Sequence, residues 1–244
     1  MTWLLVVSSV CYLCGSSRVL IFAAGFVFQS IYLLQRSLSL GRLPLLGPHD
    51  TLAFFALSIA AMSLITSCAH PVRRSRWFTV SSGITAGLFS LCALTFKPSN
   101  LPLPQILDTL WFELHVVLAF FSYALFVVGG AVLCSVSDAG GTGLPGCRVQ
   151  DRSARLVVLF DFDGDGGIWG YYAWGTYWLW TPKELWTSIL WLFCALVLHM
   201  RLKGERWDRP AAWLGVAGVV VMLFTYLGVS MLMKSSHRFL IQIR

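Results

Sequence analysis

The feature that most constrains this chain is a series of apolar stretches, each close to the length that a helix needs to cross a lipid bilayer. A hydrocarbon core about 30 Å thick requires roughly 20 mainly apolar residues per helix. The apolar stretches are bounded by charged residues, proline or glycine, and they cover residues 1–14, 19–34, 52–68, 77–96, 110–134, 185–202 and 211–233. We therefore predict an all-α, polytopic transmembrane helix bundle of about six to eight spans.

Composition supports a membrane protein and argues against a soluble or nucleic-acid-binding one. The 244 residues are 57% hydrophobic and 12% charged, and a soluble domain carries about twice that share of charged residues. The net charge of +7 comes from small groups of Lys and Arg between apolar stretches, without the basic stripe of a nucleic-acid-binding surface. Cys11 and Cys14 form a CxxC that no His follows, so it is not a haem-attachment motif.

The basic residues predict the orientation of the spans. If successive stretches alternate in direction, one side receives 11 of the 18 Lys and Arg, and the positive-inside rule makes that side cytoplasmic. Arg36 and Arg42 follow the stretch 19–34 and belong to the other side. The Trp-rich segment 169–186 and the tail from Lys234 then also face away from the cytoplasm.

One segment conflicts with simple alternation. The chain must cross between Arg155 and Trp169, but Asp161, Asp163 and Asp165 lie there, and a carboxylate at the bilayer centre costs about 2.5–3.5 kcal/mol. We expect no ordinary transmembrane helix at this point. The alternating acidic residues also match the first half of a calcium loop, but a Tyr stands where the bidentate Glu is needed, so an acidic turn is the preferred interpretation.

The Trp-rich segment carries the densest signal in the sequence. Five Trp residues fall within 18 positions: Trp169, Trp174, Trp178, Trp180 and Trp186. Trp and Tyr are typical of the membrane interface, which is one interpretation. The other is a flat apolar surface for a large planar ligand, in which glycines permit close backbone approach and Lys183 meets a carboxylate such as a haem propionate.

Two histidines flank this segment from the same predicted side. His115 lies near the outward end of the stretch 110–134, and His237 follows the last stretch. Neutral imidazole is a good haem-iron ligand. A single His near a helix end is more often an interfacial polar group, but two beside a Trp-rich segment favour ligation. His49 and His70 match no expected position of a haem-iron ligand.

The sequence WGTYWLWTPKELW, residues 174–186, resembles the WGxxWxWDPKE signature of the CcsA/ResC-type cytochrome c biogenesis proteins, a haem-handling family with a tryptophan-rich WWD-type segment. The resemblance continues through ALVLHMRL to KSSHRFL and extends back to LHVVLAFFSYALFVVGGA. It covers about two thirds of the chain.

The resemblance implies a function for each candidate residue. His115 and His237 match the family's external pair of haem ligands, and His199 matches an intramembrane His that meets haem in transit together with a His of a CcsB-type partner. Non-covalent haem b would be held on Trp174, Trp178 and Trp180, beside Lys183, and presented to the CxxCH thiols of an apocytochrome c. This predicts haem transport at a bacterial inner membrane or a thylakoid-type membrane, with a possible part in holocytochrome c synthase (haem lyase) activity.

The implied organisation is an N-terminal group of transmembrane helices over residues 1–109 and a haem-handling core over residues 110–244. Thr181 departs from the family, which has Asp at that position of the signature. Thr is only a slightly weaker helix cap than Asp, so the cap is expected to survive. Two other functions stay open: a haem-free structural or regulatory membrane subunit, and a haem exporter or electron-transfer subunit.

Overall fold

The computed structural model describes residues 2–15, 18–69, 76–100, 102, 104–138 and 166–232. All regular secondary structure in these ranges is helical, which confirms the predicted all-α class. The chain divides into two compact units, residues 1–104 and 105–244. The predicted division lay five residues later, ahead of the stretch that begins at Leu110.

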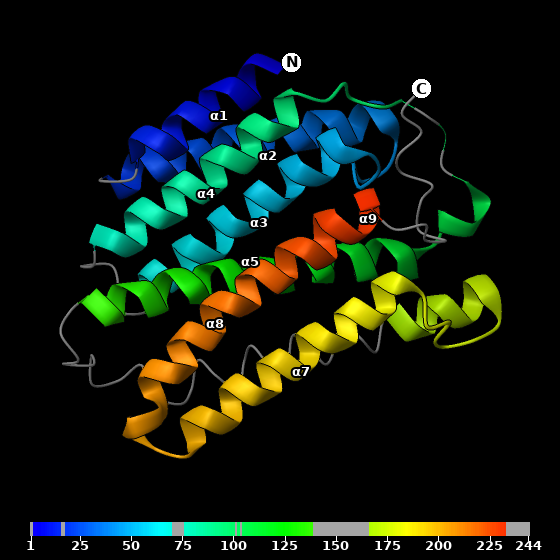
Figure 1. The fold of residues 1–244 in the computed structure, drawn as a ribbon. Helices are drawn as coiled ribbons and strands as arrows, with labels where there is room; N and C mark the ends of the chain where they lie inside the picture. The colour runs from blue at the N-terminus through cyan, green and yellow to red at the C-terminus, as the bar shows by residue number, and fades with distance from the viewer. Residues whose placement is uncertain are drawn as a thin grey trace. The chain divides into compact units, whose positions relative to one another are not determined.

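Four helices make up the N-terminal unit (Figure 1). They are α1 (Thr2–Cys14), α2 (Val19–Leu40), α3 (Pro48–Ala69) and α4 (Arg76–Leu94). Helix α1 packs against α2 and α4, and α3 packs against the same two helices. Small residues allow the close approach: Ser9 donates a hydrogen bond to the Ser90 hydroxyl at 2.8 Å, and Gly25 of α2 lies directly against Cys11 and Tyr12 of α1. Small residues at helix contacts are characteristic of membrane bundles.

A buried ion pair joins α2 to α3. Arg36 and Asp50 are 9% and 1% exposed, and the guanidinium contacts both carboxylate oxygens, at 3.2 and 3.3 Å. Arg36 also donates to the Asn100 side chain at 2.7 Å and to the Ser99 carbonyl at 2.6 Å. Helix α2 continues beyond the predicted stretch 19–34 to Leu40, so Arg36 lies within the helix, and its guanidinium is neutralised inside the unit by Asp50.

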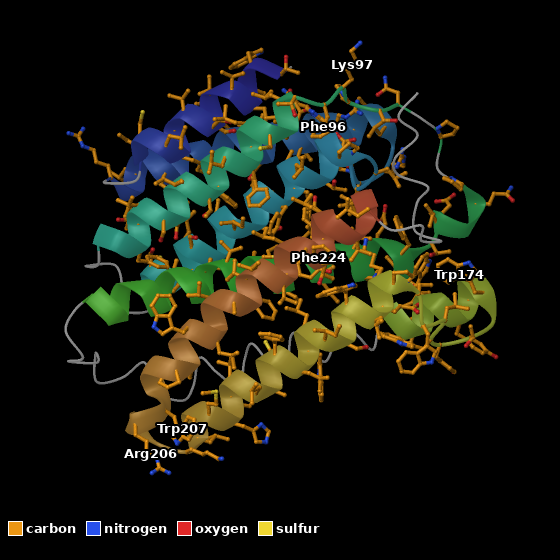
Figure 2. The ribbon with its side chains drawn as sticks, viewed as in Figure 1. Phe96, Lys97, Trp174, Arg206, Trp207 and Phe224 are labelled. Atoms are coloured by element: carbon orange, nitrogen blue, oxygen red, sulfur yellow. The ribbon has the colours of Figure 1, made fainter. Side chains whose placement is uncertain are left out.

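The C-terminal unit contains α5 (Leu110–Asp138), a short helix over residues 166–174, α7 (Pro182–Leu202) and α8 (Asp208–Leu223). Helix α8 packs against both α5 and α7 and lies between them in Figure 1. It passes into a π-helical turn, Phe224–Gly228, and then into α9 (Val229–Leu232). The Phe224 ring, labelled in Figure 2, lies 4.5 Å from the Trp186 ring of α7 between centroids.

Every predicted apolar stretch has a helical counterpart. Four described helices are long and apolar enough to span a bilayer: Val19–Leu40, Pro48–Cys68, Leu110–Gly129 and Pro182–Met200. Three shorter apolar helices accompany them: Thr2–Cys14, Phe78–Leu94 and Trp213–Gly228. The protein is therefore a polytopic helical membrane protein, as predicted. The acidic segment with Asp161, Asp163 and Asp165 lies outside the described residues.

Candidate functional site

His115 lies in the second turn of α5, half-buried against the short helix over residues 166–174. Its imidazole stacks on the Trp169 indole, with ring centroids 5.9 Å apart and planes 15° from parallel. Trp169 is 3% exposed, so it forms a fixed wall beside the histidine. A stacked ring has little freedom to tilt, and His115 is consequently held in one orientation.

Gly166 makes this arrangement sterically feasible. A Cβ at this position would lie 2.7 Å from His115 Cε1 and 2.9 Å from Nδ1, closer than van der Waals contact allows. The start of the short helix thus rests directly on the imidazole edge. The sequence marked Trp169 as part of the Trp-rich segment and considered Gly166 only as the turn glycine of an incomplete calcium loop, so its contact with His115 was not predicted.

Trp169 is the centre of an aromatic cluster. Its ring lies 5.6 Å from Phe112 of α5 and 4.7 Å from Trp174, with Trp174 edge-on at 76°. Trp174 lies at the end of the short helix (Figure 2). The predicted platform residue Trp174 is therefore connected through Trp169 to the ring of His115.

The chain reverses direction after the short helix and runs back along it. Gly175 has a φ of 73°, a conformation that glycine adopts without steric cost, and its N–H donates to the Tyr171 carbonyl at 2.9 Å. A Cβ on Gly170 would lie 3.2 Å from the Thr176 carbonyl oxygen and 3.5 Å from that of Tyr177. Glycines in the Trp-rich segment thus permit the close backbone approach that the sequence predicted.

An exposed aromatic surface results from this reversal. The rings of Tyr171 and Tyr177 stack at 4.8 Å and 19°, and Tyr172 stacks on Trp111 of α5 at 6.4 Å and 11°. Tyr171, Tyr172 and Tyr177 are all exposed. The sequence did not assign them, although a Tyr pair within a Trp-rich segment is a usable signal for stacking surfaces.

Thr181 caps α7 as predicted. Its hydroxyl accepts the Glu184 backbone N–H at 3.4 Å, and the Glu184 carboxylate accepts the Thr181 N–H at 2.8 Å. This reciprocal pair is a capping box, completed by Pro182 in the first turn. Thr181 therefore gives α7 a fully capped N-terminus.

Two predicted platform residues, Trp178 and Trp180, precede this cap in the chain, and Lys183 follows it. Trp180 is 71% exposed, Trp178 is half-buried, and Lys183 lies in the first turn of α7. Among the described residues, no carboxylate is within ion-pair distance of the Lys183 ammonium. The Lys183 side chain is half-buried.

His199 lies at the opposite end of α7, exposed on the helix surface. Its Nδ1 donates to the Ala195 carbonyl at 2.8 Å, so the lone pair of a neutral imidazole is on Nε2. Leu192 and Leu196 are exposed on the same helix. Nε2 is therefore the ring nitrogen of His199 that could serve as a metal ligand.

His49 is structural. It is 1% exposed, and its two nitrogens contact the Tyr32 hydroxyl at 2.6 Å and the Ala93 carbonyl at 2.7 Å. Both ring nitrogens are occupied, so iron ligation would require the packing to break. His70 and His237 lie outside the described residues. Within the described ranges, no group of three or more His, Cys, Asp or Glu forms a metal site.

The donor set suits haem better than a bare metal ion. Haem iron takes one or two axial ligands, often imidazole, and the ring packs against aromatic or apolar walls, whereas a bare ion needs several clustered ligands. His115 offers one fixed imidazole beside Trp169 and Trp174. The residues present therefore fit a planar iron complex.

Comparisons with known proteins find similarity to proteins of cytochrome c assembly. Residues 165–237 match the family model described as Cytochrome C assembly protein. A protein of Synechococcus sp. (strain RCC307), named Cytochrome c biogenesis protein CcsA, is 26% identical over an alignment 266 positions long, which covers 92% of this chain and 86% of that protein. The protein of the same name from Chlamydomonas reinhardtii is 27% identical over 227 residues, covering 86% of this chain and 64% of that protein.

Proposed function

Since this chain is a relative of the CcsA-type cytochrome c biogenesis proteins, we propose that it acts in cytochrome c biogenesis by holding haem for attachment to apocytochrome c. The observation that carries the proposal is the packing of His115 against Trp169 at the base of an exposed aromatic surface. A ligand imidazole with a fixed orientation and a neighbouring aromatic platform are the two elements that presentation of a planar substrate requires.

The proposed geometry uses two axial imidazoles. His115 ligates the iron from one face and His237 from the other, and Trp174, Trp178 and Trp180 contact the ring. Lys183 pairs with a propionate carboxylate, an interaction that strengthens where water is partly excluded. Two axial ligands leave no open coordination position on the iron, so the substrate is held rather than activated.

Thioether formation then depends on how the haem vinyl groups are placed relative to the CxxCH thiols. The vinyl groups of haem add the CxxCH thiols of the apocytochrome across their double bonds, and this step gains mainly from proximity and orientation. We assign no general acid or base to this chain. Its contribution is to hold haem b non-covalently, at the non-cytoplasmic face of a bacterial inner membrane or a thylakoid-type membrane.

His199 has a separate proposed function in delivery. It lies near the far end of α7 from Lys183, on a helix face that is largely exposed within this chain. A CcsB-type membrane partner that covers this face would contribute a second His, and haem would pass between the two imidazoles. This is why α7 carries an ionisable residue along an exposed apolar face, which is otherwise costly in a bilayer.

The rival function is a haem-free structural or regulatory subunit. Its support was Thr181, where the family has Asp, and the acidic segment 156–167 in place of an apolar helix. The capping box at Thr181 and Glu184 weakens the first of these grounds, because Thr fulfils the capping function of an Asp.

The test is a haem spectrum of the purified protein and of two variants. Wild type should show a six-coordinate, low-spin haem, and His115→Ala should lose this spectrum and regain it on addition of imidazole, which fills the vacated position. His199→Ala should lower occupancy without imidazole rescue, because delivery rather than ligation is affected. Trp213→Ala, an exposed Trp of α8, is the control for general damage. Absence of haem from wild type, or failure of imidazole to rescue His115→Ala, would contradict the proposal.

A further inference from the structure

Trp180 has an unusual backbone conformation. Its φ is +56°, the single positive value among the described non-glycine residues. A bulky L-residue in the left-handed region is sterically unfavourable and persists only where surrounding structure imposes it. The neighbouring turn at Gly175 has a similar φ but uses glycine, so the use of Trp at position 180 calls for a physical explanation.

The carboxylate of Glu184 supplies the constraint. Its Oε2 accepts the Leu179 N–H at 3.0 Å and the Thr181 N–H at 2.8 Å. These are the N–H groups of the residues before and after Trp180, so one oxygen atom bridges the 178–179 and 180–181 peptide units and closes the backbone around Trp180. An ordinary capping box uses the Glu only for the N-cap amide, and the bond to Leu179 is additional.

The side chain of Trp180 has no comparable support. Its indole is 71% exposed, and no aromatic ring of the described residues packs against it. The backbone therefore sets only the direction of the Trp180 Cα–Cβ bond, and the bonds to Glu184 hold that backbone. The adjacent Leu179 is also exposed, which leaves both side chains accessible to a ligand.

We infer that Glu184 is a positioning residue that holds Trp180 in the left-handed conformation, so that its exposed indole stands ready to contact haem. This inference rests on the proposed haem-holding function and names the residue that organises the exposed edge of the same site. A carboxylate accepts two N–H groups at once, since each oxygen has two lone pairs. The constraint depends on acceptor geometry rather than on the negative charge.

That distinction determines the choice of variants. Glu184→Ala removes the acceptor. Glu184→Gln keeps an oxygen that can accept both amides and removes only the charge. Ser188→Ala is the control in the next turn, because its hydroxyl donates to the Glu184 carbonyl and, among the described residues, takes no part in the cap. Trp180→Gly removes the indole and adopts a positive φ without strain.

The first measurement needs no haem. The full-length protein is labelled with 5-fluorotryptophan, and the Trp180 resonance is assigned in the ¹⁹F spectrum by its loss in Trp180→Gly. Glu184→Ala should shift or broaden this resonance as the backbone leaves the left-handed region, whereas Glu184→Gln and Ser188→Ala should leave it at the wild-type position. An unchanged resonance in Glu184→Ala, or an equal change in Glu184→Gln, would overturn the inference.

The second measurement is haem affinity. Glu184→Ala should bind haem about three- to tenfold more weakly, the range expected for one aromatic stacking contact, and Glu184→Gln should restore binding. In the Trp180→Gly background, Glu184→Ala should cause no further loss. A shifted resonance with unchanged haem affinity would overturn the assignment of Trp180 to haem contact. If wild type bound no haem, the proposed function would fail, while the ¹⁹F comparison would still decide whether Glu184 positions Trp180.

Discussion

Gly166→Ala should displace a proposed iron ligand without unfolding the protein. The added methyl would lie 2.7 Å from His115 Cε1, and the ring must retreat by about 0.7 Å to reach a contact of 3.4 Å, the lower limit of ordinary packing. Metal–ligand distances vary by only about 0.2 Å, so this shift exceeds what ligation tolerates. Overpacking costs about 1–3 kcal/mol, and the better helix propensity of Ala returns up to about 1 kcal/mol. The loss of stability should thus stay below about 3 kcal/mol.

The assay is haem titration in detergent with thermal unfolding on the same samples. Gly166→Ala should bind haem at least about tenfold more weakly, equivalent to about 1.4 kcal/mol, with a shift from low-spin to high-spin absorbance. Gly218→Ala is the matched control, because a Cβ there would lie 3.7 Å from the Phe126 ring, an ordinary contact. The reasoning is refuted if Gly166→Ala keeps the affinity and the low-spin spectrum of Gly218→Ala.

Three further predictions concern the cap, the buried ion pair and the topology. Thr181→Ala should lower stability by about 1 kcal/mol, and Thr181→Asp should stay within a few tenths of wild type, both by thermal unfolding; a large gain in haem retention with Asp would favour the haem-free function instead. Arg36→Met should cost about 3–5 kcal/mol, because Asp50 is left buried without a partner, and Arg36→Met/Asp50→Leu should recover most of this in denaturant unfolding; a double variant as unstable as the single one would contradict the prediction. Single cysteines in place of Trp174 and His237 should be labelled by an impermeant reagent from the same, non-cytoplasmic side, and labelling from opposite faces would rule out a shared site.

The helices were predictable because length and hydrophobicity alone specify them in a bilayer. Stretches 110–134 and 185–202 correspond to α5 and α7 within a few residues at each end, since charges and Pro182 define where an apolar run must stop. The cap at Thr181 was predictable for a local reason: N-cap chemistry depends on residues only three positions apart.

The short helix over residues 166–174 was not predictable from propensity. Gly166, Gly167 and Gly170 make that segment a poor helix former, and the sequence indicated a loop from Trp169 to Trp186. Tertiary packing overrides this low helix propensity. The absence of a side chain leaves room for the His115 ring at Gly166 and for the Tyr177 backbone at Gly167 and Gly170. Tertiary contact of this kind leaves no periodic signal in the sequence.

The backbone of Trp180 and the ion pair of Arg36 escaped prediction for related reasons. The residue type Trp does not predict a positive φ at position 180. The hydrogen bond from the Leu179 N–H to Glu184 can be recognised only in the three-dimensional structure. Arg36 follows an apolar stretch as a topology-determining cation would, and only the position of Asp50 reveals that its charge is neutralised inside the unit.

The π-helical turn Phe224–Gly228 sets the register of the last helix. A π turn holds one residue more than an α turn, and each α-helical residue advances about 100° around the axis, so side chains beyond Gly228 face about 100° away from where an unbroken α-helix would point them. Val229 is fully buried in this register. The turn therefore behaves as a one-residue insertion: deleting a single residue within it would restore a regular helix and rotate the described residues that follow, Val229–Leu232, by more than a quarter of a circle.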